Sequence, residues 1–302
     1  MTTDGRILIV NKPIGPTSHD VVAQARRLFK TRAVGHAGTL DPMASGVLLI
    51  LIEEATKLSS ALTLDHKSYR ATIRFGTSTD SHDALGIPVE TREVPRGWLG
   101  RKQLDVALDV ERHRTLQTPP SISAIKQQGK TAYSRHRQGE TVELSARSVH
   151  VLDLSLLEAT DESVELSITV TKGYYVRALA RDLGASLGMP SHLSSLCRTS
   201  SGCFTIEEAA CWPCHEPPPC LTMADVARRS MPTRVLSSDG IRRARCGLTL
   251  LPEHFDNFAA LANAVPNDAV EMWLDAMDHA IALGVAQSDG TFRVARGFRP
   301  AD

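Results

Sequence analysis

One carboxylate is marked out by its neighbours in the chain. Residues 35–49 read GHAGTLDPMASGVLL, with Gly35 and Gly38 before Asp41 and Pro42 directly after it. Glycine admits backbone conformations closed to other residues, and proline biases the preceding residue toward an extended backbone. The loop can therefore present the Asp41 carboxylate at the edge of a sheet, which suits a nucleophile. On these residues alone, a plain turn is the simpler interpretation.

A cysteine cluster is the second group with chemical potential. Five of the six cysteines lie between Cys197 and Cys220. The segment CWPCH at 211–215 has the spacing of covalent haem attachment, and Cys203 and Cys220 could complete a zinc site. Haem attachment of this type requires an exported protein, and the spacing fits no standard zinc finger. Reduced thiols in a linker are the favoured interpretation.

The elements around Asp41 follow from the pattern of apolar residues. A strand over Ile7–Val10 is followed by a turn and a helix that opens at Thr17 or Ser18. The continuous apolar run Val47–Ile52 predicts a buried strand directly after the Asp41 loop. Later stretches alternate with a period of two, at 69–75 and 164–170, and Val176–Leu187 has helical spacing. Strands and helices alternate irregularly, which favours a mixed sheet of the α+β class.

Composition describes an ordinary globular chain of 302 residues, with 42% hydrophobic and 23% charged residues. Lysine plus arginine equals aspartate plus glutamate at 34 each, so any nucleic-acid surface must be local. Candidate basic clusters lie at 26–32, 177–181 and 242–245. The start shows no basic stretch before an apolar run, and no uninterrupted apolar run reaches membrane-spanning length. We therefore expect a cytoplasmic protein.

The chain divides into three predicted parts. Residues 1–210 would form one large domain, and 211–231 a linker, because prolines are frequent between Cys211 and Leu221. Residues 232–302 would form a small separate domain, with β-like segments such as Gly290–Val294.

Five blocks, in this order, resemble the TruB family of tRNA pseudouridine synthases. They are NKPIGPTSHDVV at 11–22, the Asp41 loop at 35–49, KSYRATIRFG at 67–76, TPPSISAIKQQGKTAY at 118–133 and KGYYVRALARDLG at 172–184. The blocks span about two thirds of the chain, and a chance match of this length and order is very improbable. The end of the chain is weakly similar to the PUA domain of the same family, with a diverged packing domain as the alternative.

The resemblance implies a fold and a reaction. The fold would have a mixed, mainly antiparallel central sheet flanked by helices, and a β-rich PUA-like domain at 232–302. The reaction would isomerise uridine to pseudouridine at position 55 in the T loop of tRNA, after the base is flipped out of its stack. Asp41 would be the nucleophile, at either the sugar C1′ or the base C6. Arg177 would keep Asp41 ionised and oriented, since a guanidinium stays protonated and offers parallel donors.

The resemblance also implies a pocket for the base. Tyr69 would stack on the target uracil and is a candidate for handling its C5 proton, with Tyr175 and Leu196 as further walls. His36 would fill the gap that the extruded base leaves in the RNA. Without the resemblance, the first three would be read as core residues, and His36 as a loop residue with no special role.

Phosphate contacts are assigned in the same way to Lys12, Lys126 and the arginine clusters. An insertion around 115–147 would grip the RNA, so the implied partner is the T arm of tRNA, bound by a monomer with no membrane association. We expect no cofactor and no metal. Asp80 and Asp83 could be imagined as metal ligands, but the resemblance makes STDSHD at 78–83 a loop between strands. The competing hypothesis is a catalytically silent protein of the same fold that binds or folds tRNA.

Overall fold

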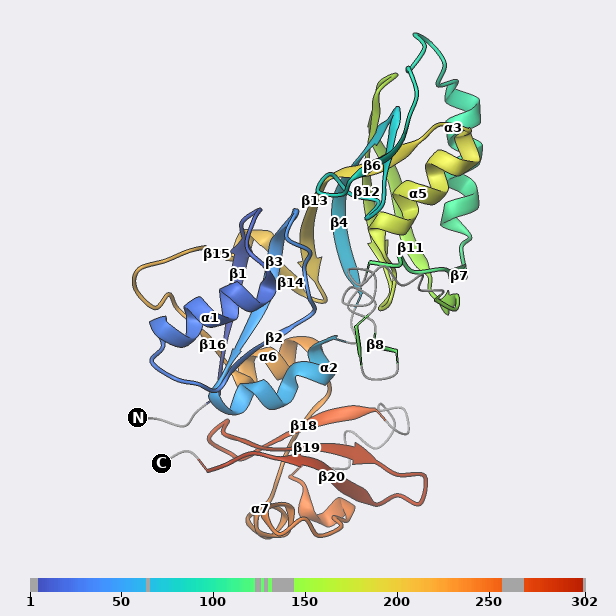
Figure 1. Cartoon of the computed structure of the whole chain (residues 1–302). Coiled ribbons are helices and arrows are strands. Elements are labelled where there is room, and N and C mark those ends of the chain that lie inside the picture. Colours follow the sequence, from blue (N-terminus) through green and yellow to red (C-terminus); the bar gives the residue numbers. More distant parts are fainter. Residues whose placement is uncertain are drawn as a thin grey trace.

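The computed structural model describes residues 5–63, 66–122, 126–127, 130–131, 144–256 and 269–300, and of 126–127 and 130–131 only the backbone. Within these residues the centre is a ten-stranded mixed sheet (Figure 1). Seven strands cross it in the order β11 (Val151–Ala159), β12 (Ser163–Val170), β4 (Lys67–Phe75), β13 (Ser191–Ser201), β3 (Ala44–Ile52), β1 (Arg6–Lys12) and β15 (Ala210–Cys211). Shorter strands pair beside them: β2 (Val34–Ala37) with β3, β14 (Phe204–Thr205) with β13, and β16 (Leu221–Thr222) with β1.

Most neighbouring strands are antiparallel, whereas β13 and β3, and β1 and β15, run parallel. The predicted α+β class with a mixed, mainly antiparallel sheet is therefore confirmed. β3 is buried along almost its whole length, with Leu48 and Ile50 in the core on one face and Val47 and Leu49 in the core on the other. A strand covered on both faces needs an apolar residue at each position, which is why its sequence is a continuous run.

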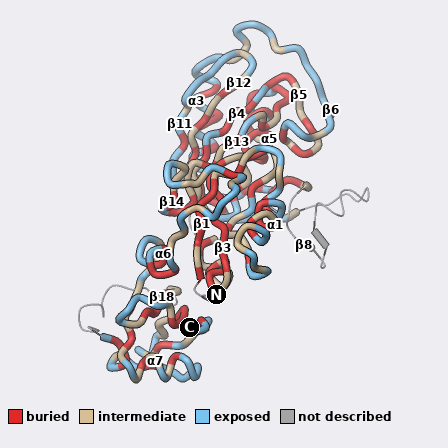
Figure 2. The backbone as a smooth tube through the Cα atoms, turned by 90° about the vertical axis from the view of Figure 1, so that its left-hand side faces the viewer, coloured by how far each residue is buried: buried red, intermediate tan, exposed pale blue. Residues whose placement is uncertain are grey.

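Helices cover both faces of this sheet (Figures 1 and 2). The core on one face is shared with α1 (Ser18–Leu28), α3 (Arg101–Arg112) and α5 (Val176–Leu187). The core on the opposite face is shared with η1 (Glu53–Leu58), α2 (Ser59–Thr63) and α6 (Met223–Ser230). α1 begins as predicted, because Thr17 and Asp20 form a reciprocal capping box. None of the helices in the described ranges is long and apolar enough to cross a membrane.

The described residues before the C-terminal sheet also contain three two-stranded ribbons and a further short 3-10 turn. The ribbons pair β5 (Thr77–Thr79) with β6 (Pro88–Thr91), β7 (Leu116–Gln117) with β10 (Arg147–Ser148), and β8 (Lys126–Gln127) with β9 (Lys130–Thr131). The turn is η2 (Ile206–Glu208). The β7–β10 ribbon lies at the two ends of the insertion predicted around 115–147, most of which lies outside the described residues.

The stretch 211–231 departs from the predicted linker. Cys211 pairs with Asn11 of β1, and Leu221 pairs with Ile7 of the same strand. Trp212 is buried in the main core, and α6 packs its apolar face on the sheet. The prolines between 213 and 219 therefore lie in a connection between two edge strands of the central sheet, a position that proline tolerates because it need not donate to the ladder.

The C-terminal part forms a second sheet in the order β17 (Thr233–Val235), β18 (Val270–Leu274), β19 (Ala280–Ala286) and β20 (Phe292–Gly297), with α7 (Ser238–Arg245) and η3 (Pro252–His254) beside it. Its own core is built on Trp273, Phe255 and Phe292. Met272 and Leu274 of β18 join the core beneath α6 and η1, so this sheet packs against the large domain (Figure 1). Its assignment as PUA-like stays a prediction.

Candidate active site

The loop between β2 and β3 carries Asp41 and is held on both sides. Ser18, at the start of α1, donates its hydroxyl to the Leu40 carbonyl at 3.1 Å and accepts the Leu40 N–H at 2.9 Å. After Asp41, the Pro42 carbonyl accepts the N–H of Gly15 at 2.8 Å. The first resembling block, at 11–22, therefore supports the backbone that presents Asp41.

Arg177, in the first turn of α5, lies beside Asp41. Its side chain is only 6% exposed, and its Nε lies 2.8 Å from Asp41 Oδ2. The N–H does not point along the line to the oxygen, so the contact is an ion pair without hydrogen-bond geometry. The Asp41 side chain keeps 35% of its surface exposed. The structure therefore brings together the predicted carboxylate and guanidinium, and leaves the carboxylate accessible.

A second carboxylate supports the same arginine, and the sequence did not assign it this role. Asp83 is buried, and its Oδ2 lies 3.7 Å from Arg177 Nη1, which also donates to the Ser81 carbonyl at 3.1 Å. Asp83 Oδ1 is occupied by the Ser81 hydroxyl at 2.7 Å and the Leu85 N–H at 3.0 Å. The sequence showed two carboxylates in STDSHD but gave no sign that α5 packs against them. In the described ranges, no three His, Cys, Asp or Glu side chains converge on a possible metal site.

A cavity of about 280 Å³ opens in front of this pair. Tyr69, Tyr175 and Leu196, the three predicted pocket walls, all line it together with Asp41 and Arg177. Tyr69 and Leu196 come from the adjacent strands β4 and β13, and Tyr175 immediately precedes α5. The remaining lining residues are Thr39, Leu40, Thr63, Lys67, Gly173, Tyr174, Val176 and Arg198.

Arg198 is a further member of the site that sequence reasoning missed. It is fully buried, and its guanidinium donates to the carbonyls of Val47 at 2.7 Å, Gly38 at 2.9 Å and Thr39 at 3.3 Å. Burial lowers its pKa from the usual value, against the opposing effects of a hydrogen bond with Tyr69 and the charge of Asp41. Arg198 lies two residues after Leu196 on one strand and hence on the same face, which was the available signal.

The close approach of β13 to β3 depends on a glycine. Gly46 has a φ of +105°, and a Cβ at this position would lie 2.2 Å from the Arg198 carbonyl oxygen. Such a separation is shorter than any ordinary contact, so only glycine fits. The third glycine of the motif at 35–49 therefore allows Arg198 to lie beneath the Asp41 loop.

The environment of the Lys12 side chain differs from the exposed one that a phosphate contact requires. Its side chain has no exposed surface, and its Nζ donates to the carbonyls of Pro13 at 2.8 Å and Pro16 at 2.9 Å. Burial lowers the pKa of Lys12 to about 8, with Asp41 opposing this shift and Arg198 adding to it. In this structure Lys12 braces the turn at 13–16 next to the Asp41 loop, because its ammonium is hydrogen-bonded to two carbonyls of that turn.

His36 does not line this cavity. His36, on β2, is half-buried, and its ring meets the edge of the His19 ring at a centroid distance of 5.5 Å. Burial first, and then the charges of His19 and Arg198, lower the pKa of His36. Its Nδ1 is buried without a hydrogen bond among the described residues. Lys126 lies in β8, and its side chain falls outside the described part of the structure.

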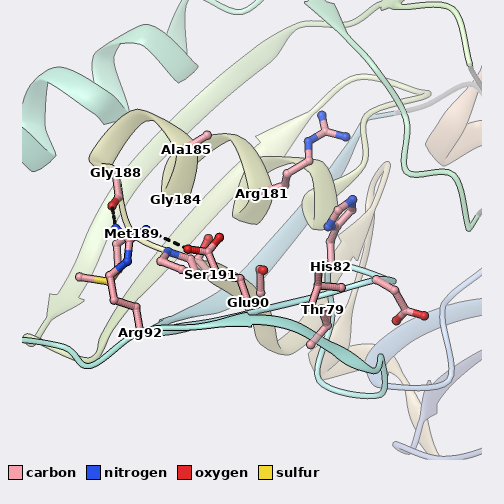
Figure 3. A pocket seen from close by; sticks show the side chains of 14 residues that line it. Thr79, His82, Glu90, Arg92, Arg181, Gly184, Ala185, Gly188, Met189 and Ser191 are labelled. Carbon is pink, nitrogen blue, oxygen red and sulfur yellow. Dashed lines mark hydrogen bonds and ion pairs between the residues drawn. The ribbon is translucent and has the colours of Figure 1, made fainter.

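A separate cavity of about 420 Å³ lies between α5 and the segment that carries Thr79 and His82 (Figure 3). It is lined by the β5–β6 ribbon and the second half of α5, and Arg92 closes one end by donating to the Gly188 carbonyl at 2.7 Å. Arg181, from the basic cluster at 177–181, lines it, but none of the residues predicted for the reaction or for the base pocket does. The residues predicted for the reaction itself therefore lie at the cavity beside Asp41.

Solved structures define the class of fold. The chain superimposes on a chain of a Cbf5-Nop10-Gar1 complex with a TM-score of 0.72 at 22% identity, covering 98% of this chain and 84% of that one. A chain of an H/ACA RNP bound to a substrate RNA containing 2′-deoxyuridine gives a TM-score of 0.68 at 21% identity, covering 98% and 85%. The fold is thus the pseudouridine synthase fold with an additional C-terminal sheet.

Sequence relatives define the family within that class. The model of the TruB family pseudouridylate synthase (N terminal domain) matches residues 26–176. The tRNA pseudouridine synthase B of Nocardia farcinica is 44% identical over 254 residues, 82% of each chain. That of Mycobacteroides abscessus is 42% identical over 269 residues, 85% of this chain and 88% of its own. The chain belongs to the TruB family of pseudouridylate synthases and is an isomerase.

Proposed function

We propose that this enzyme converts the uridine at position 55 in the T loop of tRNA to pseudouridine, with Asp41 as its nucleophile. The observation that supports the proposal is an accessible carboxylate, paired at 2.8 Å with a buried guanidinium, at the wall of a cavity. The relatives that cover most of the chain are named tRNA pseudouridine synthase B.

The reaction needs Asp41 in its charged form. A carboxylate in a partly closed cavity is unfavourable unless a cation offsets its charge, and Arg177 lies in contact to do so. The second carboxylate, Asp83, and the Ser81 carbonyl fix the guanidinium from its other side. Arg177 therefore offsets the charge of Asp41 and orients its carboxylate, while Asp41 retains the exposed surface that an attacking group requires.

The substrate base would enter the cavity between Tyr69, Tyr175 and Leu196. Asp41 attacks either the sugar C1′ or the base C6, the bond between N1 and C1′ breaks, and the uracil turns. A bond then forms between C5 and C1′, the bond to the Asp41 carboxylate breaks, the C5 proton leaves and N1 gains a proton, so all atoms are conserved, Asp41 is regenerated and no redox partner enters. Tyr69, hydrogen-bonded to Arg198, faces this space and is the group that we assign to the C5 proton.

Extrusion of the base is assigned to residues outside the cavity. His36 would occupy the gap in the T loop, and its lowered pKa favours the neutral ring that stacks among bases. Lys126 and the basic clusters would contact phosphates.

The proposal is tested with a T-arm stem–loop transcript and mapping of pseudouridine at single-nucleotide resolution. We expect modification of one loop uridine, and none in a matched transcript that carries cytidine at that position. The silent tRNA-binding alternative predicts that the transcript binds and stays unmodified. That result would contradict the proposed function.

A further inference from the structure

The residue Gln117 makes an unusual pair of contacts behind the cavity wall. It lies in β7, and its side chain is almost completely buried at 2% exposure. Its Oε1 accepts the N–H of Tyr175 at 2.8 Å, and its Nε2 donates to the carbonyl of Tyr175 at 3.2 Å. A side-chain amide offers one acceptor and two donors, so it can pair with both backbone groups of one residue, as a neighbouring strand would.

The position of Tyr175 controls two groups of the site. Tyr175 is the N-cap residue of α5, and its side chain makes no capping hydrogen bond. Its carbonyl begins the helix by accepting the N–H groups of Ala178 and Leu179, and Arg177 stands in the first turn. Whatever fixes the Tyr175 backbone therefore fixes both the Tyr175 ring and the origin of the Arg177 side chain.

The preceding residue is anchored from the same direction. The Tyr174 hydroxyl donates to Glu111 Oε1 at 2.6 Å, at the end of α3. Burial first, and then the Glu111 carboxylate, raise the pKa of Tyr174 well above its usual value, so the hydroxyl keeps its proton. Glu111 is in turn paired with Arg114 at 2.7 Å. Both anchors of the Tyr174–Tyr175 segment thus come from residues 111–117.

This anchoring segment leads directly into the insertion. β7 pairs with β10, so the two ends of the stretch between Gln117 and Arg147 lie side by side. Next to this ribbon, Arg181 of α5 donates to the Thr118 carbonyl at 3.0 Å, and the Thr171 N–H donates to the His150 carbonyl at 3.0 Å. Both ends of the insertion are therefore fastened to the segment 171–181, which carries Tyr175 and Arg177.

We propose that Gln117 is a positioning residue for the base pocket, which sets Tyr175 and Arg177 in register with Asp41 and ties them to the stem of the insertion. The inference deepens the proposed function and rests on it. Gln117 touches neither the cavity nor the reacting atoms, so it acts on the rate through the placement of Tyr175 and Arg177.

The test compares Gln117→Met with Gln103→Met, a matched change at an exposed glutamine of α3. Single-turnover rates are measured at saturating T-arm transcript, together with the Kd for the transcript. We expect Gln117→Met to lower the saturated rate about tenfold or more while Kd changes less than about twofold, because misplacement affects the chemical step most. Gln103→Met should match the wild type in both.

A second readout is independent of turnover. Hydrogen exchange of the Tyr175 amide should accelerate about tenfold or more in Gln117→Met, since its acceptor is gone. Gln117→Glu keeps the acceptor for the Tyr175 N–H but loses the donor to its carbonyl, so its saturated rate should fall between those of wild type and Gln117→Met. If Gln117→Met does not fold, the rate of Gln117→Glu decides the question.

The outcomes separate the two proposals. An active wild type with an equally active Gln117 variant, or unchanged exchange at Tyr175, would overturn only the positioning role. A wild type that forms no pseudouridine would overturn the proposed function and this inference together. A loss confined to Kd would also contradict positioning, because it would assign Gln117 to RNA binding.

Discussion

Two arginine–carboxylate pairs in this chain are alike in distance and differ in access. Arg177 and Asp41 meet at 2.8 Å in the large domain, and Arg234 and Glu271 meet at 2.7 Å in the C-terminal sheet. Both arginines are buried, but the carboxylate is 35% exposed in the first pair and 0% exposed in the second. The difference lies in what surrounds the acid.

Glu271 is closed on every side. Its Oε2 meets Arg234 Nε, and its Oε1 accepts the Trp273 indole N–H at 2.7 Å. Phe255 and Phe292 flank the guanidinium, with centroids 5.8 and 5.1 Å from its central carbon. Such a pair leaves no carboxylate surface for a substrate. In the Asp41 pair the arginine is held by Ser81 and Asp83, which leaves the aspartate free to face the cavity, and the same ionic contact then prepares a group to react.

The largest effect is expected from Asp41→Asn. An amide keeps the size of the side chain but is not a nucleophile, so the rate of pseudouridine formation should fall by roughly 10⁴-fold or more. Binding of the transcript should persist, as measured by filter binding. Asp105→Asn, at an exposed carboxylate of α3, is the control and should retain the wild-type rate. Turnover by Asp41→Asn at the wild-type rate would show that the accessible carboxylate of the Asp41 pair is not the nucleophile.

Glu271→Gln should produce the largest loss of stability. The change leaves the Arg234 charge buried without its counter-ion, which costs about 3 kcal/mol of unfolding free energy. Urea unfolding measures the loss, and the rate per folded molecule should stay within about twofold. Asp278→Asn, in an exposed pair with Arg228, should cost less than about 1 kcal/mol. Equal losses in the two variants would show that closure of the Glu271 pair has no structural effect.

Arg177→Lys should have an effect of intermediate size, on the rate of pseudouridine formation. An ammonium keeps the charge but cannot contact Asp41, the Ser81 carbonyl and Asp83 at once, so orientation is lost. We expect a fall in the saturated rate of about 100-fold, or about 2.7 kcal/mol of activation free energy. The conservative change Arg181→Lys on the same helix should have a much smaller effect. A wild-type rate in Arg177→Lys would reduce the role of the arginine to charge alone.

The smallest effect is expected for Lys12. It should be seen in the pH dependence of the unfolding free energy. Its pKa in the folded state is lowered to about 8 from 10.5, so the unfolded chain holds this proton more tightly. Stability from this group therefore rises between about pH 8 and pH 10.5 as the proton is lost. The difference in unfolding free energy between wild type and Lys12→Met should shift in favour of the wild type across that range. A difference that is constant with pH would show that the Lys12 ammonium is hydrated in the folded state, with no lowering of its pKa.

The sequence predicted the part of the site that motifs and periodicity encode. The family resemblance predicted the pairing of Asp41 with Arg177. The alternation of apolar and polar residues predicted that Tyr69 lies on the inner face of β4, and Tyr69 is buried there. Arg198 was missed because a charged residue on a strand is normally assigned to the exposed face. Its burial depends on the carbonyls of Gly38 and Thr39 in the Asp41 loop and of Val47 in β3, which lie 151 to 160 positions away in the chain.

Two other predictions from the sequence also differ from the structure because of contacts between residues that are far apart in the chain or leave no periodic pattern. Lys12 was read as a phosphate contact, yet the turn at 13–16 encloses it, and only the path of the folded backbone determines that. The prolines after Cys211 led to the prediction of a linker at 211–231. They did not reveal that short strands at either end pair with β1, since two-residue strands leave no periodic pattern.

The central claim is that the exposed side of the Asp41 carboxylate meets a flipped uridine in the cavity. A crystal structure of Asp41→Asn bound to the T-arm transcript tests this most directly. We predict one loop uracil against Tyr69, with its ribose or C6 within about 4 Å of residue 41, a contact distance. A complex in which every loop base stays outside the cavity, or in which residue 41 faces away from the nucleoside, would contradict the account.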